Sequence, residues 1–302
     1  MASTDGSFRA IFYAFLANGG IAIAKGIAAY VTGSGSMLAE AIHSVADCTN
    51  QVLLFVGLKG ASRPADARHP LGYGKLTYFW SFMVAILLFS MGGLFSIYEG
   101  VHKLQDPEPL DRAWIALLVL GISIALEGGS LLGALREIKH LRKGYSLIHW
   151  LKHSRRAEMV VVFGEDVAAL IGLVLASGFV GLAAITGNAI FDAMGSIAIG
   201  LVLITISVFL IVRVRALLIG IAAAPDLIEV IETAIADDDS VVEVFNVITI
   251  QFGARVVLAA KVAMRPELSI GQAAERLNRL EARIKVACPE IGWCFMEPDV
   301  RA

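Results

Sequence analysis

Residues 34–47 read SGSMLAEAIHSVAD and place His43 and Asp47 four positions apart, in a segment apolar enough to cross a membrane. On a helix, positions i and i+4 lie on one face. A charged group at bilayer depth is costly, so it marks a transport path or a bound ion. Histidine and aspartate are also ligands that transition metals accept. The stretch therefore predicts a transmembrane helix with a polar, metal-binding face.

The composition of the whole chain is that of a membrane protein. Hydrophobic residues make up 57% and charged residues 17% of the 302 positions, and the mean hydropathy is +0.73. Soluble domains carry about 45–50% apolar and about 25% charged residues. The net charge of −2 gives no reason to expect a nucleic-acid partner. The expected surroundings are a lipid bilayer.

Charge and hydropathy divide the chain into two expected domains. Residues 1–218 hold 17 Lys and Arg against 14 Asp and Glu, whereas residues 219–302 hold 8 against 13. The first part contains six runs of about 20 or more apolar residues, each long enough to cross a bilayer of about 30 Å. The runs are 9–32, 35–58, 76–102, 113–136, 160–186 and 189–213.

The loops indicate the orientation of these six helices. Basic residues gather after the second, fourth and sixth runs, in residues 59–75, 136–156 and 213–215. The other connections are short or of mixed charge. The positive-inside rule then places both termini and the tail in the cytoplasm. Residues 137–159 are interpreted either as an ordinary basic loop or as an amphipathic surface helix around Trp150.

The tail reads as a small α+β domain. Helices are expected over 225–236 and 270–287, and strands over 241–251, 255–264 and 293–296. About 80 residues bury only a modest core, which favours oligomerisation. The three cysteines form no disulfide framework, and Cys288 and Cys294 are expected to be ordinary thiols.

Several further polar residues fall inside the apolar runs. Glu165 and Asp166 are adjacent in the fifth run, where two carboxylates repel unless a cation or proton lies between them. Asn18, Asn50 and Gln51 serve either as ligands or as interhelical hydrogen-bond partners. Asp192 is expected to cap a helix or to bond a neighbour, and Lys25 to snorkel or to pair with an acid such as Glu127.

At these residues the sequence resembles the cation diffusion facilitators, which are divalent-metal/proton antiporters. The resemblance rests on residues 34–47, on Asp66 with residues 69–75 (HPLGYGK), and on the order of six helices and an α+β tail ending at residues 295–299 (FMEPD). Residues 47–51, 136–139 and 163–172 are similar to the branch that contains the mitochondrial zinc exporter of animals and its bacterial relatives.

The resemblance implies a fold, a site and an activity. The fold is an all-α bundle of six transmembrane helices with a cytoplasmic ferredoxin-like dimerisation domain. His43 and Asp47 match the first pair of ligands and Asp166 one of the second pair, while Val162 stands where the family has the fourth ligand. Glu165, Asn50, Asn18, Glu127 or water are the candidates to replace it. Asp66 and His69 resemble a loop metal site whose third position is here Tyr73.

The expected function is export of a divalent metal from the cytoplasm in exchange for protons, by a homodimer in a membrane such as the bacterial inner membrane. Zn²⁺ suits a mixed site of histidine and carboxylates, although Mn²⁺, Fe²⁺, Co²⁺ and Ni²⁺ stay open. No enzyme activity and no catalytic cofactor are expected. Two alternatives are a metal receptor or scaffold that does not transport, and an intramembrane metal-dependent hydrolase, which lacks a general-base motif here.

Overall fold

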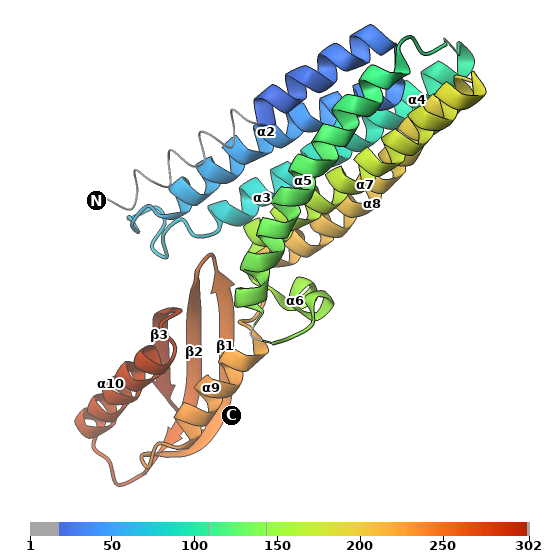
Figure 1. Cartoon of the computed structure of the whole chain (residues 1–302). Helices are drawn as coiled ribbons and strands as arrows, with labels where there is room; N and C mark the ends of the chain where they lie inside the picture. Colours follow the sequence, from blue (N-terminus) through green and yellow to red (C-terminus); the bar gives the residue numbers. More distant parts are fainter. Residues whose placement is uncertain (1–17, 108, 143, 301–302) are drawn as a thin grey trace, which may run out of the picture.

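The structure, a computed structural model, describes residues 18–107, 109–142 and 144–300. A long helical bundle extends away from a small α/β tail (Figure 1). Residues 18–32 are helical, whereas residues 9–17 of the first predicted run lie outside the described part. The other helices of the bundle are α2 (Gly35–Ala61), α3 (Leu76–Leu87), η1 (Leu88–Leu94), α4 (Phe95–Gln105), α5 (Ala113–Leu141), α6 (Leu147–His153), α7 (Ala157–Thr186) and α8 (Ile190–Ile219).

Five spans within the described residues are long and apolar enough to cross a membrane: α2, the continuous stretch Leu76–Gln105, α5, α7 and α8. These spans agree with the second to sixth predicted runs and confirm a multi-pass membrane bundle. The second, third, fourth and sixth runs continue several residues beyond their predicted ends, and α7 begins three residues before its predicted start. Such polar or basic ends lower the mean hydropathy of a window without breaking the helix.

The third span contains a π-helix that the sequence pattern did not predict. The turn Leu88–Leu94 separates α3 from α4 and contains the pair Gly92 and Gly93. The hydroxyls of Ser90 and Ser96 donate to the carbonyls of Ile86 and Gly92. Side-chain bonds of this kind compete with the helix ladder, and π-turns are frequent at functional sites. Gly92 places this turn beside His43, since an added Cβ would lie 3.8 Å from His43 Nδ1.

Asp192 joins the beginnings of α2 and α8 at the end of the bundle away from the tail. Its side chain accepts hydrogen bonds from Ser34 Oγ at 2.7 Å, Gly35 N at 2.6 Å and Ser36 N at 3.2 Å. Lys103 Nζ lies 3.8 Å away. Of the two sequence interpretations, the structure therefore shows the bond to a neighbour. One carboxylate in the first turn of α8 therefore accepts hydrogen bonds from free N–H groups at the start of α2.

The tail consists of α9 (Pro225–Ala236), β1 (Val241–Phe252), β2 (Arg255–Met264), α10 (Ile270–Ala287) and β3 (Ile291–Pro298). β1 pairs with β2 antiparallel and β2 with β3 parallel. Both helices cover one face of the sheet (Figure 1) and enclose a core around Leu258, Val262, Leu280 and Ile284. This arrangement confirms the expected α+β, ferredoxin-like tail, with a longer third strand than predicted.

The turn between β1 and β2 contacts the beginning of α3. Tyr78 Oη donates to Gly253 O at 3.0 Å, and an added Cβ on Gly74 would lie 2.7 Å from Phe252 O. The contact needs glycine on both sides. A side chain on Gly74 would clash with Phe252 O, and Gly253 has a φ of +65°, which other residues rarely adopt. The connection between α5 and α7 also packs against the bundle through its described residues. It contains the short helix α6, whose Trp150 is buried in the bundle core.

Candidate metal centre

The polar stripe of α2 lies inside the bundle. The side chains of His43 and Asn50 are fully buried, and that of Asp47 is 19% exposed. His43 Nδ1 lies 3.6 Å from Asp47 Oδ1. Among the described residues, both ring nitrogens of His43, Asp47 Oδ1 and Asn50 Oδ1 are buried without a hydrogen-bond partner. Buried polar atoms nearly always have a hydrogen-bond partner. These atoms have none, so they suit a ligand such as a cation.

Glu165 brings α7 to this stripe. Asn50 Nδ2 donates to Glu165 Oε1 at 2.5 Å, and Glu165 is buried. Asp166, about 100° further round the helix, accepts a bond of 3.4 Å from Ser130 Oγ on α5. From the sequence, Asp166 was the expected ligand from this helix and Glu165 a candidate for the fourth position. The structure shows Glu165 in contact with α2 and Asp166 turned toward α5.

The donors lie in one region without forming a finished cage. The charges of Asp47 and Asp166 act on Glu165, and those of Glu127 and Asp47 act on Asp166. In the described ranges, however, no three histidine, cysteine, aspartate or glutamate side chains are close enough to hold a metal together. Val162 packs against the bundle core, and Asn18 is half-buried near the start of the first described helix.

A buried ion pair that the sequence pattern did not predict lies beside the stripe. Lys25 Nζ lies 3.1 Å from Glu40 Oε2 and donates to Ser44 Oγ at 2.7 Å. The side chains of Lys25 and Glu40 are both fully buried. The sequence interpretation offered Glu127 as a partner for Lys25. The signal that would have found the pair is the spacing of Glu40 and Ser44, which puts both on the same face of α2.

The loop residues Asp66 and His69 form a small network of their own. Asp66 Oδ1 accepts from the amides of Arg68 and His69, and Asp66 Oδ2 accepts from Tyr73 Oη at 2.6 Å. The Tyr73 hydroxyl, followed by the His69 amide, holds the pKa of Asp66 below its usual range. The rings of His69 and Tyr73 are in contact, with their centroids 4.2 Å apart and their planes tilted by 36°. The carboxylate that a metal would need already has three donors within the loop.

This network predicts how the loop responds to acid. A carboxyl whose folded pKa is depressed stabilises the fold above its unfolded pKa, about 3.9, and loses that effect as the pH falls through the folded pKa. We expect Tyr73→Phe to shift the loss of amide protection at Arg68 and His69 to higher pH, as measured by hydrogen exchange. Tyr145→Phe, in the other basic connection, is the control. An unchanged midpoint in Tyr73→Phe would contradict the network.

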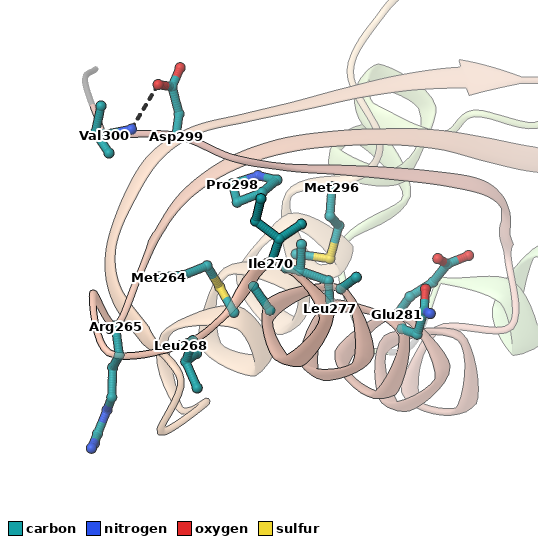
Figure 2. Close-up of a pocket in the computed structure, with 13 residues that line it drawn as sticks. Met264, Arg265, Leu268, Ile270, Leu277, Glu281, Met296, Pro298, Asp299 and Val300 are labelled. Atoms are coloured by element: carbon teal, nitrogen blue, oxygen red, sulfur yellow. Dashed lines mark hydrogen bonds between the residues drawn. The ribbon is translucent and has the colours of Figure 1, made fainter.

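The tail offers no comparable set of metal ligands among its described residues. Burial raises the pKa of the Cys294 thiol to about 11, and it also raises that of Cys288, so both thiols stay protonated near neutral pH. Figure 2 shows the groove beside α10, which is lined largely by apolar side chains including Met264, Leu268 and Met296. This groove lies in the tail, away from His43 and Glu165.

The fold and this polar interior agree with the comparison to known proteins. The model of the cation efflux transmembrane domain matches residues 11–219. The chain belongs to the cation efflux family. The family resemblance seen in the sequence is thereby confirmed, and the matched residues include all the polar side chains described above for α2, α5 and α7.

Individual relatives extend the comparison. The chain is 35% identical over 244 residues to the mitochondrial proton-coupled zinc antiporter SLC30A9 of Xenopus laevis, covering 80% of this chain and 44% of that protein. The human protein of the same name is 33% identical over 80% of this chain and 43% of its own length. Metal tolerance protein C4 of Arabidopsis thaliana is 37% identical over 63% of this chain and 42% of its own. This cation efflux protein thus spans less than half the length of these relatives.

Proposed function

We propose that this protein is a secondary transporter that exports a divalent transition metal from the cytoplasm in exchange for protons, with Zn²⁺ as its main substrate. The observation that carries the proposal is the unsatisfied pair His43 and Asp47, buried in a membrane helix beside the Asn50–Glu165 contact. Buried ionisable groups of this kind mark ion pathways in membranes. The printed names of the relatives, zinc antiporter and metal tolerance protein, support the same class of substrate.

The proposed substrate ligands are His43, Asp47, Asp166 and Glu165. Nitrogen and carboxylate donors suit Zn²⁺, and also admit Mn²⁺, Fe²⁺, Co²⁺ or Ni²⁺. Glu165 replaces the ligand absent at Val162, a role supported by its contact with Asn50 on α2. Asn50, Asn18 and Glu127 are reserve donors. The loop pair Asp66 and His69 is the weakest candidate, because the loop itself satisfies Asp66.

Exchange follows from competition for the same donors. Metal ligands must be deprotonated, so protons arriving from the far side release the metal and then occupy its carboxylates. Movement of one group of helices against another exposes the site to each side in turn. Such exchange needs a membrane with a proton gradient, as a bacterial inner membrane has. We place both termini and the tail in the cytoplasm, because the basic connections lie at the tail end of the bundle.

We further propose that residues 1–218 form the transmembrane domain and that residues 219–302 form a dimerisation domain. The sheet face opposite α9 and α10 supports a second copy as partner. Ile248, Ala259 and Phe295 lie opposite one another across the three strands. Ile248 and Phe295 are 51% and 57% exposed. Exposed apolar side chains gathered on one face are typical of an interaction surface.

A flux measurement tests the transport proposal. We expect purified protein in sealed vesicles with an acidic interior to load Zn²⁺, with uptake that stops when the pH gradient is collapsed. Vesicles without protein are the control. No loading of Zn²⁺, Mn²⁺, Fe²⁺, Co²⁺ or Ni²⁺ would contradict an antiporter. Metal binding without flux would favour the receptor or scaffold, and metal-dependent cleavage of a substrate would favour the hydrolase.

A further inference from the structure

Glu40 is buried with one satisfied and one unsatisfied oxygen. Lys25 Nζ lies 3.1 Å from Glu40 Oε2. Glu40 Oε1 is buried and has no hydrogen-bond partner among the described residues. It faces α7, because an added Cβ on Gly172 would lie 2.5 Å from it. The free oxygen therefore lies between α2 and α7, the two helices that also carry Asp47 and Glu165.

The positions of these groups form a line along the α2–α7 boundary. Glu40 precedes Asp47 by seven residues, and Gly172 follows Glu165 by seven. Seven residues are two helical turns, or roughly 10 Å along the axis. The two contacts, Glu165 with Asn50 and Gly172 beside Glu40, show that the helices run antiparallel. Glu40 thus lies two turns beyond Asp47, toward the end of the bundle away from the tail, with His43 between them.

The Lys25–Glu40 pair is costly for a merely structural contact. Removing two charges from water costs several kcal/mol per ion, and well-packed apolar residues often replace such a pair without loss. The field of Lys25 also reaches His43, Asp47 and Glu127. A lysine ammonium is a compact, mobile point charge on a flexible stem. A lysine with these properties is suited to pair with a carboxylate at times when no metal ion is bound to it.

We propose that Glu40 is a second binding station for the transported divalent cation, between α2 and α7, and that Lys25 occupies this station as a tethered cation when no metal is there. The inference rests on the proposed transport function and adds two residues to its path. A metal ion leaving Asp47 and Glu165 passes His43 and takes the free oxygen of Glu40. Lys25 then repels the ion and restores its own contact with the carboxylate, which favours release.

The test is a charge cycle on Zn²⁺ affinity, measured by titration of the detergent-solubilised full chain and compared with transport kinetics in vesicles. Lys25→Met frees both oxygens of Glu40, so we expect tighter Zn²⁺ binding by about tenfold, equivalent to about 1.4 kcal/mol, with a lower kcat. Glu40→Gln leaves the ammonium uncompensated, so we expect weaker binding by a similar factor and a higher KM. In Lys25→Met/Glu40→Gln the affinity should return toward that of the wild type.

Lys103→Met is the matched control, since it removes another lysine beside a buried carboxylate, Asp192, at the far end of the bundle. We expect it to leave Zn²⁺ affinity unchanged. Shifts of the same sign in Lys25→Met and Glu40→Gln, or no shift in either, would overturn the station. If Lys25→Met does not fold, the Zn²⁺ affinity of Glu40→Gln is compared with that of Lys25→Met/Glu40→Gln. Equal affinities in these two variants would contradict the proposed role of Lys25. Zn²⁺ binding by the wild type without flux overturns the transport function alone, whereas absence of binding overturns both.

Discussion

Replacing Asp47 or Glu165 with alanine should abolish metal transport while leaving the fold intact. Asp47 lies beside His43 on the polar stripe of α2, and Glu165 bonds across the boundary between α2 and α7 to Asn50. Loss of even an outer partner of a bound metal costs about 10–100-fold in affinity, so loss of a direct ligand should lower the initial rate by about 100-fold or more. The measurement is the rate of Zn²⁺ uptake into vesicles under a fixed pH gradient.

The same measurement distinguishes the two adjacent carboxylates of α7. Because Asp166 is turned toward Ser130 on α5, Asp166→Ala should reduce the rate less than Glu165→Ala does. Glu137→Ala, which removes an exposed carboxylate from α5, is the matched control and should transport like the wild type. A larger loss in Asp166→Ala would show that α7 turns before it binds metal. Wild-type rates in both Asp47→Ala and Glu165→Ala would refute the ligand assignment.

Replacing Asp192 with alanine should cause the largest loss of stability in the bundle. The side chain is 1% exposed and accepts bonds from Ser34, Gly35 and Ser36. Each buried donor left unsatisfied costs about 1–3 kcal/mol. We therefore expect a loss on the order of 3–5 kcal/mol, measured as a lower midpoint of thermal unfolding in detergent, because removal of one partner strands the others.

A graded series separates the bonds of Asp192 from the ordinary helix cap. Ser34 is the N-cap residue of α2, and its Oγ accepts a hydrogen bond from Met37 N. Ser34→Ala removes this cap and also one of the three bonds to Asp192, so it should cost about 1–2 kcal/mol. Asp192→Asn keeps an acceptor oxygen but loses the charge, so its midpoint should fall between those of Ser34→Ala and Asp192→Ala. Equal midpoints in Ser34→Ala and Asp192→Ala would mean that the carboxylate contributes nothing beyond the cap.

The tail was predicted closely, because its sequence carries local signals at several boundaries. Pro225 begins α9, the turn at residues 253–254 separates β1 from β2, and Ser269 with Gln272 forms a capping box at α10. Such signals act within a few residues of the chain. The π-helix of the third span had no such signal. It contains Ser90 and the pair Gly92 and Gly93 within an apolar run, and hydropathy does not distinguish one helical hydrogen-bond pattern from another.

Residue types and their order were enough to predict the membrane-spanning character of the chain, the α+β tail and the burial of His43 and Asn50. Hydropathy and helical spacing depend only on residue type and order, so these features can be predicted from the sequence. Tertiary structure alone decided which partner each polar group has. It joined Glu165 to Asn50, Lys25 to Glu40 and Asp192 to the start of α2. Neighbouring residues such as Glu165 and Asp166 face different helices, and only the packing of those helices determines what each side chain meets.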